Sequence, residues 1–169
     1  METIGFGGSC HWCTEAIFLS LRGTAEVLQG WISPADNLQS FSEAVIVKYN
    51  AEIISLETLV AIHLHSHSCT STHSMRAKYR SAIYVFDDQD AVYAKELLIR
   101  MQPEFEDLII TEVLRFGDFR LNKPEYLNYY FSDPSRPFCE NIVNPKLSEL
   151  MKNFSASVDQ EKLAHLVKI

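Results

Sequence analysis

The fold is decided by two neighbouring segments, Ala25-Glu26-Val27-Leu28-Gln29-Gly30-Trp31-Ile32 and Ser42-Glu43-Ala44-Val45-Ile46-Val47-Lys48-Tyr49. Both are rich in aliphatic and β-branched residues, which are enriched in strands. The first is followed by Ser33-Pro34-Ala35-Asp36-Asn37, whose residue types form turns. Because only a short connection separates the two strands, they are expected to pair antiparallel, since parallel neighbours in a doubly wound sheet need a long crossover.

Further elements are expected on either side of this pair. They are a strand over 3–6, a helix over 14–22, a helix after the N-cap Ser55, a polar loop over 65–73, a strand over 79–86, a helix from Asp87 or Asp88 to Gln102, and a strand over 108–114. The order βαββαβ with a further αβ unit predicts an α+β fold, a two-layer sandwich of ferredoxin-like type. Its sheet would be mostly antiparallel with helices on one face, followed by an irregular C-terminal tail.

Size and charge set further limits. The 169 residues suffice for one domain, and no linker-like segment divides them, so 1–154 is expected to form a single domain and 155–169 a tail with a short helix over 159–169. A net charge of −7 argues against a nucleic-acid partner. No apolar run is long enough for a membrane span and no basic leader is visible, which predicts no membrane partner and a cytoplasmic protein.

A cysteine stands at the start of the first expected helix, within Gly5-Phe6-Gly7-Gly8-Ser9-Cys10-His11-Trp12-Cys13-Thr14-Glu15. The unpaired N–H groups and the positive dipole end of a helix N-terminus favour an anion, and a thiolate is an anion. An ordinary thiol has a pKa of about 8.5, whereas such contexts lower it to roughly 3.5–7.5. Cys10 is therefore the leading candidate for a reactive thiol.

The spacing of Cys10 and Cys13 allows three interpretations. The pair forms a thioredoxin-like dithiol, although a βαββ continuation fits that motif poorly. It forms half of a zinc site with Cys69 and a histidine, although the spacing is unlike that of a zinc finger and no metal is expected. Alternatively, Cys13 is simply a buried helical residue. The histidines at 63, 65, 67 and 73 are expected to decorate a polar loop.

Four blocks of the chain carry a resemblance to a known family. The segment 7–15 resembles the Gly-Gly-Cys-Phe-Trp-Gly-x-Glu signature of the methionine sulfoxide reductase A family, the peptide-methionine (S)-S-oxide reductases. The three other blocks are similar to family segments in the same order: Ser42-Glu43-Ala44-Val45, Tyr79-Arg80-Ser81-Ala82-Ile83-Tyr84 and Pro137-Phe138-Cys139-Glu140-Asn141-Ile142-Val143-Asn144-Pro145-Lys146-Leu147. Together they span residues 4 to about 154.

The resemblance implies a reaction that needs no cofactor. The Cys10 thiolate would attack the sulfur of a methionine S-sulfoxide, free or in oxidised proteins, while Glu43 protonates the departing oxygen and a sulfenic acid forms on Cys10. A proton-donating Glu43 must be buried, because desolvation raises a carboxyl pKa. Tyr79 would donate its hydroxyl to the sulfoxide oxygen. Trp12 would form the wall that holds the substrate methyl group.

Three positions depart from the family pattern in the expected substrate site. His11 replaces a phenylalanine beside the methyl pocket, which would make one wall polar and titratable. Trp31 replaces a tyrosine, so that only an indole N–H remains as a donor. Ser74, or Met75, stands where an acidic residue precedes the Tyr-Arg-Ser strand. These changes could alter the substrate preference and the rate. A further hypothesis is that the protein is a binding domain that keeps the fold and has lost the activity.

The resemblance also implies that a second cysteine resolves the sulfenic acid as a disulfide, which thioredoxin reduces. Cys139 is the candidate by its place in the tail motif. Cys13, which replaces a family glycine, is the candidate by proximity, but helical residues three apart have Cβ atoms roughly 5–6 Å apart, longer than a disulfide prefers. Cys139 is therefore slightly favoured as the resolving cysteine, and Cys69 is a weaker candidate. Direct reduction of the sulfenic acid by an external thiol is a further alternative. The alternative function is a thiol-disulfide oxidoreductase that uses Cys10 and Cys13.

Overall fold

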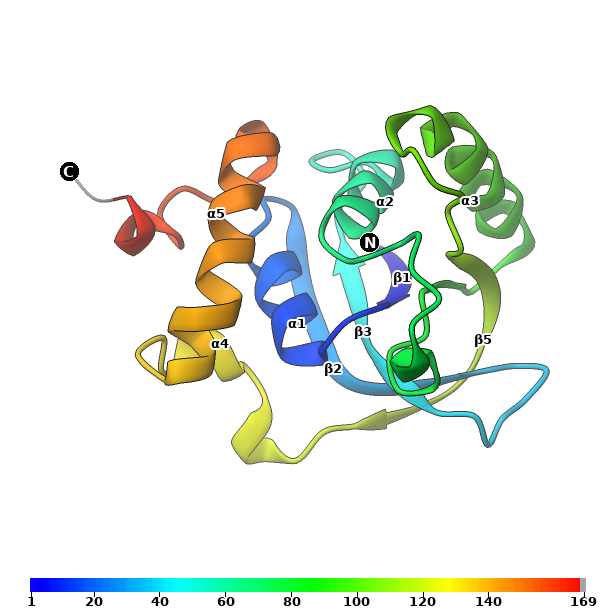
Figure 1. The fold of residues 1–169 in the computed structure, drawn as a ribbon, viewed down its shortest axis with the longest axis horizontal. Helices are drawn as coiled ribbons and strands as arrows, with labels where there is room; N and C mark the ends of the chain where they lie inside the picture. The colour runs from blue at the N-terminus through cyan, green and yellow to red at the C-terminus, as the bar shows by residue number, and fades with distance from the viewer. Residues whose placement is uncertain (168–169) are drawn as a thin grey trace.

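The computed structural model describes residues 1–167, whose strands close into a five-stranded barrel in the order β1-β3-β2-β5-β4 (Figure 1). The strands are β1 (Glu2–Gly7), β2 (Thr24–Pro34), β3 (Ser42–Tyr49), β4 (Ala82–Val85) and β5 (Glu112–Leu121). The β2–β3 pair is antiparallel, as expected from its short connection. The predicted two-layer, ferredoxin-like sandwich is wrong, because β1 pairs with both β3 and β4 and β4 lies parallel to β5.

The barrel closes through β5, which changes partner along its length. Residues 112–115 run parallel to β4, and residues 116–121 run antiparallel to β2. Gly117 lies after the change of partner, where a Cβ atom would stand 2.7 Å from the carbonyl oxygen of Pro34. The sequence placed this strand over 108–114 and therefore missed the half that joins β2.

Helices cover the barrel in two groups (Figure 1). They are α1 (His11–Leu19), α2 (Leu56–His65), α3 (Asp88–Met101), α4 (Tyr129–Ser132) and α5 (Asn144–Asn153). In the view of Figure 1, α2 and α3 lie on one side, and α1 lies on the other with α4 and α5 beside it. Ser55 caps α2 by accepting a hydrogen bond from Thr58 N, and Asp87 caps α3 in the same way from Asp90 N. No helix within residues 1–167 has the length and apolar character needed to cross a membrane.

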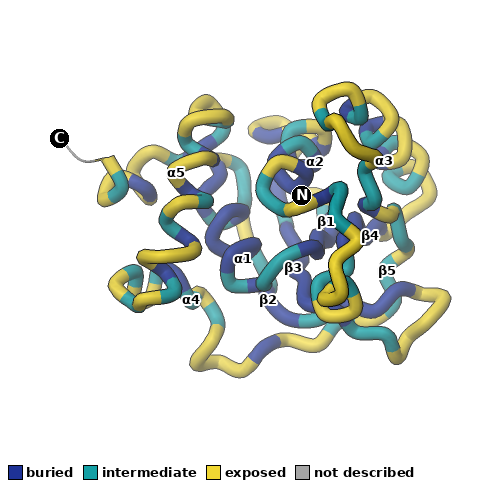
Figure 2. The backbone as a smooth tube through the Cα atoms, in the orientation of Figure 1, coloured by how far each residue is buried: buried dark blue, intermediate teal, exposed yellow. Residues whose placement is uncertain are grey.

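Side-chain alternation along the strands separates two cores. On β3, Val45 and Val47 belong to the main core with side chains of the helices, whereas Ala44 and Ile46 belong to a smaller cluster built from strand residues alone, inside the barrel. Buried residues accordingly run through β1, β3, β4 and α1, whereas no residue of β5 is buried and the outer sides of α3 and α5 are exposed (Figure 2). Because Glu43 lies two residues before Val45, its side chain is on the helix-facing side, toward α1.

The C-terminal segment returns to the body of the protein. A 3₁₀ turn covers Ser155–Ser157, and Val158 forms an isolated antiparallel bridge with Leu21. Up to Val167 the segment expected as a helix over 159–169 contains one further 3₁₀ turn, Ala164–Leu166; residues 168 and 169 lie outside the described part. The treatment of 155–169 as a separate tail stays a prediction.

Candidate active site

Cys10 lies at the junction of β1 and α1, directly before the first residue of the helix. Its carbonyl oxygen accepts the first helical hydrogen bonds, from Cys13 N and Thr14 N, each at 3.1 Å. A hydrogen bond from the Cys13 thiol, assisted by the N–H groups of Trp12 and Cys13, lowers the pKa of Cys10, while burial and the charge of Glu43 oppose this effect. The half-buried thiol is therefore set up to exist as a thiolate.

Cys13 has the opposite environment one turn along α1. Its side chain is buried, with 1% exposed. Donation of its hydrogen to Cys10, burial and the charge of Cys10 raise the pKa of Cys13, which keeps it a thiol. Cys139, fully buried at the start of the π-helical segment Cys139–Val143, also acts on Cys13 electrostatically. Three of the four cysteines thus gather at α1, and all four are free thiols.

Glu43 is buried, as the proposed proton donor requires, with 5% of its surface exposed. It pairs with Trp31 across the β2–β3 ladder. Its Oε1 accepts a hydrogen bond from His11 N at 3.3 Å and lies 3.3 Å from His11 Nε2. Its Oε2 lies 3.6 Å from Nζ of Lys78, whose side chain is more than half exposed.

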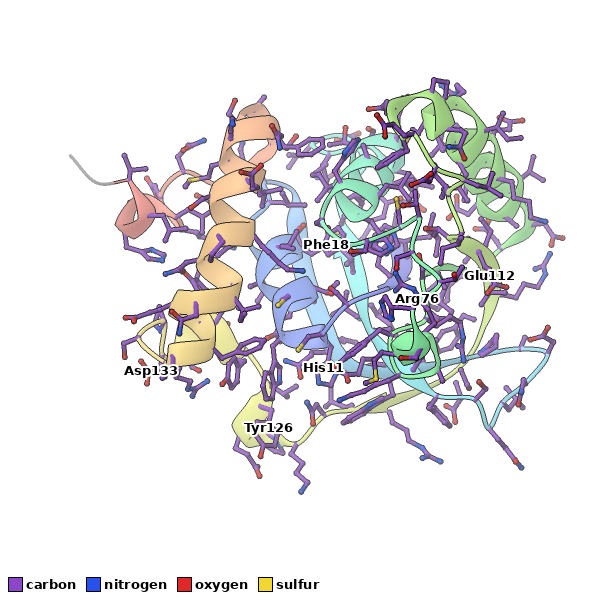
Figure 3. All side chains as sticks on the ribbon, viewed as in Figure 1. His11, Phe18, Arg76, Glu112, Tyr126 and Asp133 are labelled. Carbon is purple, nitrogen blue, oxygen red and sulfur yellow. The ribbon has the colours of Figure 1, made fainter. Side chains whose placement is uncertain are left out.

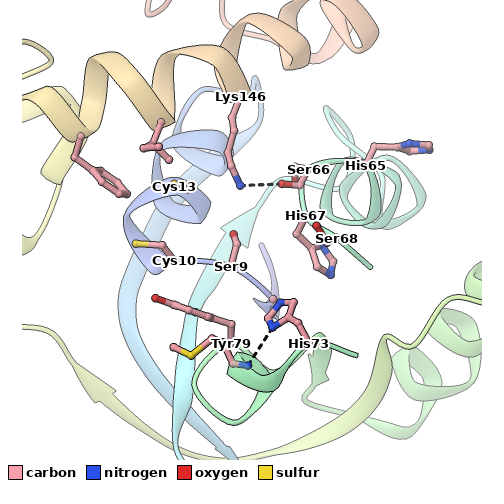
Figure 4. A pocket seen from close by; sticks show the side chains of 14 residues that line it. Ser9, Cys10, Cys13, His65, Ser66, His67, Ser68, His73, Tyr79 and Lys146 are labelled. Atoms are coloured by element: carbon pink, nitrogen blue, oxygen red, sulfur yellow. Dashed lines mark hydrogen bonds between the residues drawn. The ribbon is translucent and has the colours of Figure 1, made fainter. Parts of the chain in front are cut away.

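A cavity of about 740 Å³ opens beside Cys10 (Figure 4). The Tyr79 ring lies under Cys10 in this view, with its hydroxyl on the same side as the Cys10 sulfur. Phe138, Ile142 and Met75 give the cavity apolar lining. Phe138 and Ile142 were not singled out from the sequence, although both lie near Cys139 in the tail block, and Met75 was named only as the alternative to Ser74.

The other expected substrate contacts lie outside this lining. His11, Trp12, Trp31 and Ser74 are absent from the described residues that line the cavity. Ser74 is exposed at the start of a 3₁₀ helix, Ser74–Ala77, between His73 and Met75, which do line it. His11 is buried, and its ring and that of Trp31 form a T-shaped pair with 5.1 Å between ring centres.

Trp12 belongs to an aromatic cluster next to the cavity. Its ring stacks on Tyr129 at 4.0 Å between centres and meets Phe138 edge-on at 5.5 Å. Tyr126 completes the cluster at 5.7 Å. Because Phe138 also lines the cavity, Trp12 supports one of its walls from behind. The buried Trp12 Nε1–H has no hydrogen-bond partner among the described residues.

The loop that follows α2 is held by Arg76, which is labelled in Figure 3. Arg76 donates to four backbone carbonyls, at Gly8, Ser68, Ser71 and Tyr79. It therefore ties this loop to the chain on either side of the cavity.

Two of the histidines expected to decorate a polar loop instead stack under Gly8. The rings of His63 and His67 are 4.3 Å apart, and a Cβ atom on Gly8 would collide with His67. Burial lowers the pKa of His63 well below its usual value and that of His67 to about 4. Within residues 1–167, no group of His, Cys, Asp and Glu side chains is arranged to hold a metal ion.

Residues 2–158 match the family model described as peptide methionine sulfoxide reductase. Curated relatives include the peptide methionine sulfoxide reductase MsrA of Trichodesmium erythraeum, 29% identical over 94% of this chain and 98% of the relative, and that of Paenarthrobacter aurescens, 26% identical over 92% and 98%.

Solved structures share the fold. Methionine sulfoxide reductase A of Corynebacterium diphtheriae superposes with a TM-score of 0.70 at 23% identity, over 79% of this chain and 75% of that chain. Mxr1 from Saccharomyces cerevisiae in complex with Trx2 superposes with a TM-score of 0.61 at 20% identity, over 72% and 81%.

Proposed function

Because the chain belongs to the peptide methionine sulfoxide reductase family, we propose that it reduces the S epimer of methionine sulfoxide, free or in oxidised proteins, to methionine. The observation that carries the proposal is the lowered pKa of Cys10 at the mouth of the cavity. A thiolate in that position can attack an electrophilic sulfur placed in the cavity.

The reaction joins the sulfoxide oxygen to Cys10. The Cys10 thiolate attacks the sulfoxide sulfur, and a proton from Glu43 neutralises the oxygen. The hydroxyl group then passes to Cys10 sulfur, so that methionine leaves and a sulfenic acid stays on the protein. The burial of Glu43 and its charge effect on Cys10 support this role. Tyr79, which lines the same cavity, donates its hydroxyl to the oxygen as negative charge develops there.

We propose that Cys13, in preference to Cys139, is the cysteine that resolves the sulfenic acid on Cys10. Its thiol lies one turn along α1 from Cys10 and is the largest influence on the pKa of Cys10, so attack on the sulfenic acid forms a Cys10–Cys13 disulfide and releases water. The buried Cys139 would act only on Cys13, by exchange. Thioredoxin then reduces the disulfide; family membership and the yeast structure that contains Trx2 support this partner. The four free cysteines suit action in the reducing cytoplasm.

A single-turnover assay with separate S and R epimers tests this proposal. We expect one methionine per wild-type chain from the S epimer, with loss of two thiols, and none from Cys10→Ser. Cys13→Ser should lose one thiol per methionine, whereas Cys139→Ser and the control Cys69→Ser should lose two. Full turnover by Cys10→Ser would overturn the function. Exchange with protein disulfides without sulfoxide turnover would favour the thiol-disulfide oxidoreductase instead.

A further inference from the structure

A second cavity adjoins the catalytic one, between α2 and α5. Its volume is about 220 Å³, against about 740 Å³ for the cavity beside Cys10. His65, Ser66 and Lys146 line both cavities, so the two meet at these residues. In Figure 4 all three lie above Cys10, whereas Tyr79 lies below it. The second cavity therefore extends the site beyond the place of the reacting sulfur.

One face of the last helix turns toward both cavities. The lining residues on this face are three or four positions apart in the sequence: Ile142, Lys146, Glu149, Leu150 and Asn153. Such spacing places side chains on one side of a helix. The π-helical segment Cys139–Val143 passes directly into α5, so this face continues from the catalytic cavity to the second one.

The second cavity is mainly apolar. Ile62 from α2 and Leu150 from α5 are 0% and 4% exposed and both line it. Pro145 and Phe154 add further apolar lining. An apolar group that enters such a space leaves water and gains dispersion contacts. A pocket for a whole small molecule has a volume of roughly 300–1,000 Å³, so this smaller cavity suits a single apolar side chain.

The residues between the two cavities are held in place. The His65 ring stacks on Phe105 with 4.7 Å between ring centres, and its Nε2 lies 3.2 Å from Glu104 Oε1. Lys146 Nζ donates to the carbonyl oxygen of Ser66, the C-cap of α2, at 3.4 Å. An ammonium group has three hydrogens, so Lys146 can also donate to the carbonyl group of a peptide that passes from one cavity to the other.

We propose that the second cavity is a subsite for an apolar side chain that flanks methionine sulfoxide in a polypeptide substrate. The inference rests on the proposed function and narrows its substrate class from free or bound methionine sulfoxide to oxidised polypeptides. Continuity with the catalytic cavity identifies this occupant. An extended chain spans up to about 7 Å over two residues, so a neighbouring side chain of the same peptide reaches the adjoining cavity. The free amino acid has no second side chain to place there.

Matched pentapeptides test the proposal. Each is blocked at both ends and has the S epimer of methionine sulfoxide at its centre, with leucine or asparagine at one other position and glycine at the rest. Leucine and asparagine are similar in size, so the pair isolates apolar burial. With dithiothreitol as reductant, we expect kcat/KM to be about tenfold higher for leucine than for asparagine at one of the four positions. Ratios within about twofold of one at all four positions would overturn the proposal.

Variants of α5 show where the leucine binds. Glu149→Trp and Asn153→Trp each add volume from an exposed residue that lines the second cavity, and each should bring the leucine-to-asparagine ratio to within about twofold of one. Glu149→Gln removes the charge without adding volume and should keep the tenfold ratio. Lys152→Trp, at an exposed α5 position outside the lining, should also keep it. A tenfold ratio that survives in both Glu149→Trp and Asn153→Trp would overturn the proposal.

Binding to Cys10→Ser separates the subsite from catalysis. The dissociation constants of the leucine and asparagine peptides should differ about tenfold in Cys10→Ser and agree within about twofold once Glu149→Trp is added. Absence of turnover in wild type, with this binding difference present, would contradict the proposed function and support the subsite. Turnover with no difference between the peptides would do the reverse. A raised KM for thioredoxin in Glu149→Trp, with an unchanged leucine-to-asparagine ratio, would assign the cavity to the reductant and overturn the proposal.

Discussion

Cys13 follows Cys10 by three residues, so its buried thiol lies one helical turn along α1 from Cys10. Its interaction with Cys10 is the largest influence that lowers the pKa of Cys10, and the same interaction raises the pKa of Cys13. The two thiols are therefore unequal: the first is prepared to react, and the second holds its proton until the first has been oxidised.

Replacement of Cys13 by alanine should make Cys10 less reactive. Without the donated hydrogen bond the pKa of Cys10 rises, so a smaller fraction is thiolate at pH 7 and alkylation by iodoacetamide should slow about tenfold. Mass spectrometry of the peptide that contains Cys10 measures the alkylation rate of Cys10 separately from that of the other thiols. Cys139→Ala is the matched control, since it removes another buried thiol and should leave the rate within about twofold of wild type.

Loss of the Tyr79 hydroxyl should slow the chemical step. Tyr79→Phe keeps the ring that lines the cavity and removes the donor to the sulfoxide oxygen. Removal of one such donor costs on the order of 10²-fold in kcat, so we expect a similar drop in the single-turnover rate with little change in substrate affinity. Tyr126→Phe, in the aromatic cluster around Trp12, is the control and should keep its rate. A change confined to KM would contradict the assigned role.

Stability should fall as the solution is acidified through the range of the buried histidines. Burial lowers the pKa of His67 to about 4 and lowers that of His63 well below its usual value. Between about pH 6.5 and pH 4, the unfolded chain takes up protons that the folded chain refuses, so the free energy of unfolding decreases as pH decreases. For His67 alone the loss is about 3 kcal/mol.

Urea unfolding at half-unit steps from pH 4.5 to 7.5 measures this dependence. His67→Gln should flatten the slope, because glutamine does not titrate, although it also weakens the bond to Ser81 Oγ. His73→Gln, at an exposed histidine in the same loop, should keep the wild-type slope. Equal slopes in all three proteins would contradict the assignment of the pH dependence to His67.

The local pattern of the sequence predicts most strands and helices, and it fails where distant segments meet. The strand over 42–49 has the predicted bounds, and Ser55 caps α2 as expected. Closure of the barrel depends on β5, whose second half reads Phe116-Gly117-Asp118-Phe119-Arg120-Leu121. Its glycine and its charged residues give a weak strand signal, and only its pairing with β2 makes it a strand.

The features of the site likewise divide into local ones, which the sequence predicts, and long-range ones, which it does not. The helix-start position of Cys10 follows from adjacent residues, whereas the burial of Glu43 was expected from the role that the resemblance implies; both are present in the structure. The environment of His11 could not be predicted, because it depends on Gly30 and on Asn122, more than a hundred residues away.

Arg76 should prove essential for the shape of the cavity. Its guanidinium group donates to the carbonyls of Gly8 and Tyr79, each at 2.8 Å, and to two loop carbonyls. Lysine keeps the charge but lacks the planar fork, so Arg76→Lys leaves carbonyl groups unpaired. We expect a loss of about 2 kcal/mol in the free energy of unfolding and a rise in KM, because Gly8 lies two residues before Cys10. The control Arg100→Lys, at an exposed pair with Glu57, should change stability by less than about 0.5 kcal/mol. Equal effects of the two substitutions would show that the carbonyl contacts of Arg76 do not hold the loop.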